Sequence, residues 1–186
     1  LVHNIGTKAE LKKSKKEFYT YKEGIMNYGN IKNTDIANGE GIRVSLFVSG
    51  CTHHCKNCFN AEAWDFNYGN PFTPEVEEQI LELLSPSYIA GLTLLGGEPM
   101  EPCNQKVLLP FIKKVKERYP EKNIWCYSGY LFDQQILGEM TKKYDFTLPL
   151  ISLFDVMVDG KYVDELHDLK LQFRGSSNQR IIDVQQ

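Results

Sequence analysis

Short apolar runs alternate with helix-like patterns through most of this chain, and this alternation constrains its fold more than any other feature. Strand-like runs occupy residues 42–48, 89–95, 123–127 and 150–158. Apolar residues recur at helical spacing between them, as over residues 107–115. Such alternation predicts parallel strands joined by right-handed helical crossovers.

Further helix signals lie in the connecting segments. Thr73-Pro74-Glu75 predicts a helix start, with a capping residue, a proline at the first helical position and an acid in the first turn. Residues 136–140 predict another helix. Pro110 lies inside the pattern of residues 107–115, where it should kink or delay the helix.

Chain length limits how many strand–helix units the fold can contain. A unit takes about 30 residues, so this chain of 186 residues has room for about five units rather than the eight of a closed barrel. We therefore predict an α/β fold, an open partial (β/α) barrel of about five to six parallel strands. Residues 26–186 would form this domain.

The first 25 residues differ in composition from the rest. They hold six lysines and three glutamates, a net charge of +3, whereas the whole chain carries −3. We predict that residues 1–25 are a basic tail, disordered or foreign to the domain, with Met26 near the natural start. The alternative is a basic arm that contacts an acidic partner. The negative net charge of the whole chain argues against a nucleic-acid binder, and no apolar stretch approaches a membrane span.

Three cysteines follow the first strand-like run on a short loop. Cys51, Cys55 and Cys58 have the spacing C-x3-C-x2-C. Three thiolates fall short of the four ligands of a structural zinc site, but they can hold three irons of a four-iron cluster and leave the fourth iron open. Zinc with His53 or His54 as fourth ligand remains an alternative, as do redox thiols.

The cysteine count bears on the compartment. Five cysteines in 186 residues are few and odd in number, and nothing in the sequence resembles a secretory signal. We therefore expect a reducing, cytoplasmic compartment that keeps the thiols available for metal.

A glycine-rich turn follows the second strand-like run. Gly96-Gly97-Glu98-Pro99 ends the run 89–95. Two glycines let the backbone approach a ligand closely, and Glu98 is an acceptor suited to an ammonium group. Ligands of parallel sheets sit at the carboxyl ends of the strands, so this turn and the cysteine loop could face one pocket. A plain loop is the alternative.

The cysteine loop followed by Gly-Gly-Glu-Pro resembles the pattern of the radical S-adenosylmethionine (SAM) enzymes. Four segments narrow the resemblance to the activating proteins of anaerobic ribonucleoside-triphosphate reductases. These segments are Asp35–Arg43, Phe47–Asn60, Asp155–Lys161 and Arg174–Arg180. The resemblance covers about Met26 to Val184, and the last segment distinguishes the chain from the related activase of pyruvate formate-lyase.

The resemblance implies a radical SAM activase. A 4Fe-4S cluster on the three cysteines would chelate SAM through its open iron, cleave it reductively and so generate a glycyl radical on the large reductase subunit. A low-potential donor such as flavodoxin or ferredoxin would supply the electron. No general acid or base is required. Two alternatives remain: an activase of another glycyl-radical enzyme, and a non-enzymatic zinc module that binds a partner.

The resemblance also implies roles for single residues. Gly96, Gly97 and Glu98 would hold the amino end of SAM, and Phe59 would contact the adenine, with Asn57 and the backbone at Cys58 beside it. Partner docking is predicted for four polar residues, with a capped loop as the alternative: Arg174, Ser176, Ser177 and Asn178.

Other polar and sulfur-containing residues have weaker assignments. Ser128-Gly129 either lines the SAM pocket or forms a turn. Asp155, Asp159 and Lys161 either hold the ribose or carboxylate of SAM or form a solvated salt bridge. Cys103 and Cys126 are predicted to be packing residues, and His53 and His54 to support the cysteine loop.

Overall fold

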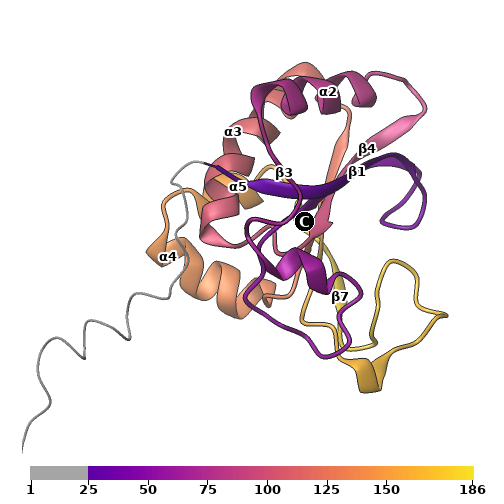
Figure 1. The fold of residues 1–186 in the computed structure, drawn as a ribbon, viewed down its shortest axis with the longest axis vertical. Coiled ribbons are helices and arrows are strands. Elements are labelled where there is room, and N and C mark those ends of the chain that lie inside the picture. Colours follow the sequence, from indigo (N-terminus) through magenta and orange to yellow (C-terminus); the bar gives the residue numbers. More distant parts are fainter. Residues whose placement is uncertain (1–24) are drawn as a thin grey trace, which may run out of the picture.

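The computed structural model describes residues 25–186, so the predicted tail lies outside the described residues except for Ile25. Within this range seven strands form one mixed sheet, in the order β3-β1-β2-β4-β5-β6-β7 (Figure 1). The strands are β1 (Asn27–Asp35), β2 (Ile42–Val48), β3 (Asn70–Pro71), β4 (Ile89–Gly96), β5 (Asn123–Ser128), β6 (Val156–Asp159) and β7 (Arg180–Asp183).

The centre of the sheet is parallel and its two sides are antiparallel. β2, β4, β5 and β6 pair in parallel, whereas β1 pairs antiparallel with β2 and β3, and β7 pairs antiparallel with β6. The α/β class is therefore confirmed, but the prediction of five to six parallel strands was wrong, because four are parallel. Residues 36–41, which join β1 to β2, are too few for a parallel crossover.

The helices lie mostly where the sequence predicts them. They are α2 (Pro74–Leu84), α3 (Pro102–Arg118), a π-helical segment (Phe132–Met140), α4 (Thr141–Lys143) and α5 (Thr147–Ile151), with 3₁₀ turns at Ala61–Trp64 and Asp164–Leu166. α2 begins directly after Thr73, as predicted. α3 runs without a break through Pro110, so the predicted delay was wrong. The run 150–158 was misread as one strand, since α5 occupies its start and β6 its end.

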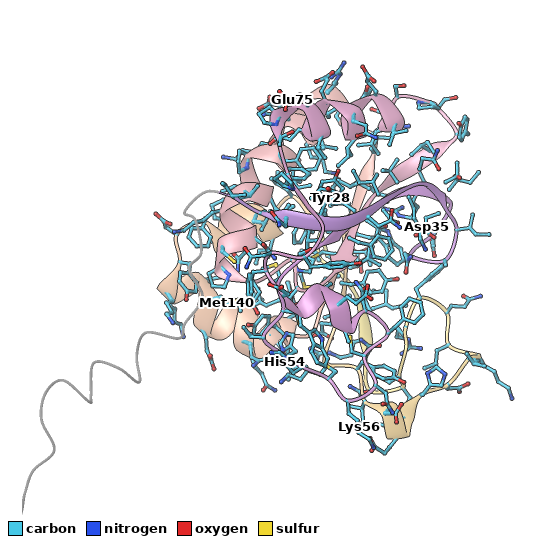
Figure 2. The ribbon with its side chains drawn as sticks, in the orientation of Figure 1. Tyr28, Asp35, His54, Lys56, Glu75 and Met140 are labelled. Atoms are coloured by element: carbon cyan, nitrogen blue, oxygen red, sulfur yellow. The ribbon has the colours of Figure 1, made fainter. Side chains whose placement is uncertain are left out.

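The two faces of the sheet differ in what covers them. One face, here called the helix-covered face, presents alternate residues of the parallel strands to the helices. Its buried side chains are Val44, Leu46, Val48, Leu92, Leu94, Ile124, Cys126 and Met157. They pack against apolar residues of α2, α3, α5 and the π-helical segment, including Phe111 and Leu84. Met140 of the π-helical segment, labelled in Figure 2, belongs to the same cluster. This layer is the hydrophobic core.

The opposite face, here called the open face, carries the intervening residues of the same strands. They include Arg43, Phe47, Thr93, Leu95, Trp125 and Tyr127. In Figure 1 the C-terminal segment, coloured yellow, lies at the lower right, and the purple cysteine loop lies beside it at the lower centre, below α2. This face therefore has more polar and aromatic character than the helix-covered face.

Arg43 shows how the open face is held together. The side chain is fully buried; its Nε donates to Thr93 Oγ1 at 2.7 Å and its Nη1 donates to Asn123 Oδ1 at 2.6 Å. The guanidinium also lies 5.4 Å from the centre of the Trp125 ring. Burial lowers the pKa of Arg43 to about 10, so the group stays charged at neutral pH. One cation thus joins β2, β4 and β5.

Among residues 25–186 we find no helix with both the length and the apolar character needed to cross a membrane.

Candidate active site

The carboxyl ends of the four parallel strands surround one cavity of about 450 Å³. Val48 pairs with Gly96 and Ser128 with Asp159, so neighbouring strands end level with one another. All the residues predicted to hold the cluster or SAM line this cavity: Cys51, Cys55, Asn57, Cys58, Phe59, Gly96, Gly97 and Glu98. The structure therefore brings the cysteine loop and the glycine turn to one site, as expected for a parallel sheet.

The cysteine loop is fixed at its inner end by backbone hydrogen bonds. Gly50 N–H donates to Ala63 O at 2.8 Å, and Cys51 N–H donates to Trp64 O at 3.2 Å. His54 and Asn57 adopt left-handed backbone angles, with φ of 49° at His54 and 55° at Asn57. These angles wind the loop tightly and direct its three sulfurs toward the cavity.

The three thiols differ in burial. Cys51 is buried, whereas Cys55 and Cys58 are partly exposed. Burial raises the pKa of Cys51 to about 12 and also raises that of Cys55, so both thiols hold their protons at neutral pH and metal binding must displace them. In the part of the chain that the structure describes, no group of three or more His, Cys, Asp or Glu is arranged to hold a single metal ion. The three cysteines line one cavity, but their sulfurs are not positioned to bind a single metal ion together.

The glycine turn packs directly on the cysteine loop. Gly97 N–H donates to Val48 O at 2.7 Å, and Glu98 N–H donates to Gly50 O at 2.8 Å. A Cβ on Gly97 would lie 2.6 Å from Gly50 O, and Gly96 has a φ of +107°, which favours glycine. The two glycines are thus required by contact with the chain itself, in addition to any role toward a ligand.

Glu98 is buried, and its carboxylate is fully engaged. Its Oε1 accepts from Met100 N–H at 2.8 Å and from Ser128 Oγ at 2.9 Å. Its Oε2 accepts from Gly129 N–H at 2.7 Å and lies 2.8 Å from His53 Nε2. Because an ionised carboxylate can only accept hydrogen bonds, His53 is placed to donate to Glu98 through Nε2. Glu98 therefore ties the glycine turn to the end of β5 and to the cysteine loop, and it has little capacity left for an ammonium group.

A second carboxylate, Glu101, makes a parallel connection. Its Oε1 accepts from Thr52 N–H at 2.9 Å and from Thr52 Oγ1 at 2.6 Å. Tyr130 donates to the same oxygen at 3.4 Å, and its ring packs edge-on against His53 at 4.3 Å between centres. The inner half of the cysteine loop is thus held by two buried acids from the segment that follows β4.

The outer half of the cysteine loop is held by charged and polar contacts at the surface. Asn57 Nδ2 donates to Asp164 Oδ2 at 2.8 Å, and Lys56 forms an ion pair with Glu165 at 2.7 Å. Figure 2 places Lys56 at the opposite end of the molecule from Glu75 on α2. Phe59 lines the cavity but its side chain is fully exposed. The rim is therefore less anchored than the inner loop.

The comparisons with known proteins agree with this geometry. Residues 37–182 match the family model described as a 4Fe-4S single cluster domain. The activating protein named "Anaerobic ribonucleoside-triphosphate reductase-activating protein" from Haemophilus influenzae is 46% identical over 158 residues, which cover 84% of this chain and 97% of that protein. The chain belongs to this family of activating proteins.

Relatives with the same name occur in other organisms. The activating protein of Escherichia coli K12 is 40% identical over 156 residues, covering 83% of this chain and 96% of that protein. The one from Enterobacteria phage T4 is 42% identical over 156 residues, covering 84% and 93%. The family resemblance is confirmed, and the matching domain supports an iron–sulfur cofactor over the zinc alternative.

The predicted docking residues of this activating protein do not line the cavity. Ser176 is buried, where its Oγ accepts from Val163 N–H at 3.1 Å, and Asn178 Nδ2 donates to Lys161 O at 2.9 Å. Ser177 is exposed. Gln179, which sequence reasoning did not single out, accepts from Gly175 N–H at 2.8 Å. Most of this polar segment is therefore engaged in hydrogen bonds within itself and with residues 161–163.

Among the four predicted docking residues, Arg174 has a buried side-chain nitrogen without a hydrogen-bond partner in residues 25–186. Its Nη1 donates to Gln179 O at 3.0 Å, which braces the loop. Its Nε is buried without a hydrogen-bond partner. Arg174 therefore differs from the serines and Asn178 in having a buried nitrogen without a partner in the described part of the chain.

The late acidic residues are structural. Asp159 is fully buried and pairs with Arg180 of β7. Asp155 lies at the other end of β6, where it pairs with Lys116 at 2.8 Å and accepts from Ile124 N–H at 2.7 Å. Neither lines the cavity, and Lys161 does not either, whereas Ser128 and Gly129 do.

The two cysteines outside the loop lie away from the cavity, whereas His54 packs within the cysteine loop region. Cys126 is buried in the core on the helix-covered face, and Cys103 lies on α3; neither lines the cavity. His54 packs edge-on against Trp64 at 4.6 Å between ring centres. Sequence reasoning missed the contacts of Glu101 and Tyr130 with the cysteine loop, since no local motif marks either residue.

Proposed function

We propose that this chain is a radical SAM activase that generates a glycyl radical on the large subunit of an anaerobic ribonucleoside-triphosphate reductase. The observation that carries the proposal is the meeting of Cys51, Cys55 and Cys58 with the turn Gly96–Glu98 around one cavity. The names of the relatives supply the partner. A zinc module that only binds a partner would have no use for the glycine turn.

The donor set fits a 4Fe-4S cluster. Three thiols face one cavity, and soft thiolates are the ligands that such clusters prefer. Asn60 N–H donates to Cys58 Sγ at 3.4 Å, a contact of the kind that tunes the reduction potential of a cluster. We propose that the three cysteines hold three irons and that the fourth iron binds SAM.

The chain's own residues would position and enclose the reactants. Cys51, Cys55 and Cys58 would hold the cluster, which when bound and reduced would supply the electron for cleaving SAM to methionine and a 5′-deoxyadenosyl radical, the species that would take a hydrogen atom from the partner's glycine. Glu98 is saturated by internal contacts, so we assign the holding of the SAM amino group to the backbone of the turn rather than to its carboxylate. Phe59 and Asn57 lie at the rim, where the adenine would enter.

The rest of the proposal concerns architecture and partners. We propose that the four parallel strands form part of an open barrel whose open face admits a loop of the reductase. A low-potential protein such as flavodoxin or ferredoxin would supply the electron in the cytoplasm. We propose no role for nucleic acid or for a membrane.

An anaerobic reconstitution tests the function directly. The iron-loaded chain is mixed with SAM, dithionite and purified reductase, and the glycyl radical is measured by electron paramagnetic resonance. We expect a brown protein, release of 5′-deoxyadenosine and a radical on the reductase. A colourless zinc protein that binds the reductase without SAM cleavage would contradict the proposal. Radical formation on a different glycyl-radical enzyme, and none on the reductase, would favour the alternative activase.

A further inference from the structure

Glu101 is a buried carboxylate beside the cysteine loop, and the chemistry described above gives it no task. Its residue surface is only 5% exposed. Its Oε1 accepts from three donors: Thr52 N–H at 2.9 Å, Thr52 Oγ1 at 2.6 Å and Tyr130 Oη at 3.4 Å. An ionised carboxylate only accepts hydrogen bonds, and three donors on one oxygen favour that form. The chain therefore keeps a negative charge next to Thr52, the residue that follows Cys51.

This charge has no cationic partner. No lysine, arginine or histidine among residues 25–186 forms an ion pair with Glu101. Its donors are one backbone amide and two hydroxyls, all neutral, and the amino end of α3, which begins at Pro102, adds only a partial positive charge.

The neighbouring acid Glu98 is different, because it lies 2.8 Å from His53, a group able to share its charge. Burying an ionised carboxylate without an opposite charge costs stability. The position of Glu101 beside a cluster loop therefore suggests that the charge itself has a function.

The charge of Glu101 acts on sulfur atoms near it. Burial is the main cause that raises the pKa of Cys51 to about 12, and the charges of Glu98 and Glu101 raise it further. Burial also raises the pKa of Cys103 to about 11, with Glu101 as the next cause. In both cases a fixed negative charge disfavours a second one in a place where little water screens it. A cluster held by Cys51 would experience the same repulsion.

We propose that Glu101 lowers the reduction potential of the cluster held by Cys51, Cys55 and Cys58, and does so through its negative charge. The proposal rests on the proposed function and deepens it. The reduced cluster carries one more negative charge than the oxidised cluster, so a fixed carboxylate nearby disfavours uptake of the electron. The electron that the donor protein delivers is then held less tightly, and its transfer to the sulfonium of SAM is more favourable. Glu101 is in this sense a positioning residue and not a catalytic one.

Two substitutions separate the charge from the contacts. Glu101→Gln removes the charge but keeps an oxygen that accepts from Thr52. Glu101→Asp keeps the charge on a shorter side chain, which reaches Thr52 less well. Glu117→Gln, at an exposed residue near the other end of α3, removes the same charge and is the matched control. The midpoint potential of each reconstituted cluster is measured without SAM or reductase, by redox titration followed by electron paramagnetic resonance.

We expect Glu101→Gln to favour cluster reduction by about tenfold, which raises the midpoint potential of this one-electron couple by about 59 mV. Glu101→Asp and Glu117→Gln should each change the reduction equilibrium by less than about twofold. An unchanged potential in Glu101→Gln would overturn the proposal. An equal rise in Glu101→Asp would do the same, because the contacts with Thr52 and not the charge would then be responsible.

A second measurement needs no cluster. In the metal-free chain, alkylation of each cysteine by iodoacetamide is followed by peptide mass spectrometry. Loss of the charge in Glu101→Gln should lower the pKa of Cys103 and accelerate its alkylation by about 2- to 10-fold, whereas Glu101→Asp should not. Cys126 lies in the core and should stay unreactive, which shows that each variant is folded. If Cys103 reacts no faster in folded Glu101→Gln, Glu101 carries no charge to remove and the proposal is wrong, even for a variant that binds no iron.

The failure of this proposal can be told apart from the failure of the proposed function. If the unsubstituted chain binds no cluster, or binds one and cleaves no SAM, the proposed function fails and the role of Glu101 fails with it. If the unsubstituted chain forms the cluster and the glycyl radical, but Glu101→Gln has the same midpoint potential, only the role of Glu101 is wrong.

Discussion

The two faces of the parallel sheet use neighbouring residues of the same strands for different purposes. On the helix-covered face Leu94 and Cys126 are fully buried among apolar side chains. Their sequence neighbours Thr93 and Tyr127 lie on the open face. Thr93 accepts a hydrogen bond from Arg43, and Tyr127 lines two cavities. The strand period of two separates a layer that stabilises the fold from a layer that lines the cavities. Substitutions on the helix-covered face should therefore lower stability, whereas substitutions around the cavity should lower iron or SAM binding.

The largest effect should come from the cluster cysteines. Cys51→Ala, Cys55→Ala or Cys58→Ala should each remove most of the bound iron, because two thiolates cannot retain the cluster. Iron per chain after anaerobic reconstitution measures this. Cys126→Ala, on the helix-covered face, should keep its iron and lose about 1 kcal/mol of stability. Full iron in Cys55→Ala, or iron loss in Cys126→Ala, would contradict the separation of the two faces.

The second effect concerns the contact between the glycine turn and the cysteine loop. Gly97→Val should abolish SAM binding and also displace the cysteine loop, because its Cβ would meet Gly50 O at 2.6 Å and Ala63 O at 2.8 Å. From the sequence we expected a loss of SAM binding alone. Calorimetric titration of SAM and iron per chain measure the two consequences.

A matched control for the turn is Gly138→Ala in the π-helical segment, where a Cβ meets its nearest atom at 3.3 Å. That variant should retain both iron and SAM binding. Unchanged SAM affinity in Gly97→Val would mean that the turn moves freely, and the proposed assembly of the site would then be wrong.

A smaller effect should follow from changing the buried carboxylate. Glu98→Gln replaces one accepting oxygen by an amide donor facing Ser128, Gly129 or His53, which should cost about 1–3 kcal/mol of stability. Urea unfolding of the metal-free chain measures it. Hydrogen exchange of the cysteine loop should also accelerate. Glu117→Gln, on the exposed side of α3, should change neither quantity; an equal loss there would show that the network is not responsible.

The smallest effect should come from removing the N-terminal residues that precede the described part of the chain. Removing residues 1–24 should leave iron binding, SAM cleavage and reductase activation unchanged, because the family model begins at residue 37. Ile25 is retained so that Met26, which is buried, keeps its flanking residue. A sharp loss of activation at moderate salt would instead identify the segment as a docking arm.

The sequence was most informative where chemistry is local. The cysteine spacing and the glycine turn could be read directly, and the runs 42–48, 89–95 and 123–127 became β2, β4 and β5. β1 and β7 were missed, because their burial patterns are mixed rather than continuously apolar. These antiparallel strands lie outside the parallel centre of the sheet and are set by pairing with their neighbours.

The site contacts that were missed are long-range. His53 and Glu98 are 45 positions apart, and Thr52 and Glu101 are 49 apart, so no short motif connects them. The unpaired donors of Tyr127 and Arg174 are likewise visible only once the strands are in place. Local spacing predicted which residues carry the chemistry, and tertiary packing decided which residues hold them in position.

The unequal anchoring of the cysteine loop has a consequence for repair after exposure to air. Cys51 lies in the inner half, which two buried acids and the backbone of residues 63–64 hold in place. Cys58 lies in the outer half, tied by surface contacts such as Asn57 to Asp164. When oxygen destroys the cluster, we expect the inner half to keep its shape while the outer half opens. Fresh iron and sulfide could then enter from the rim, and the chain could be recharged without unfolding.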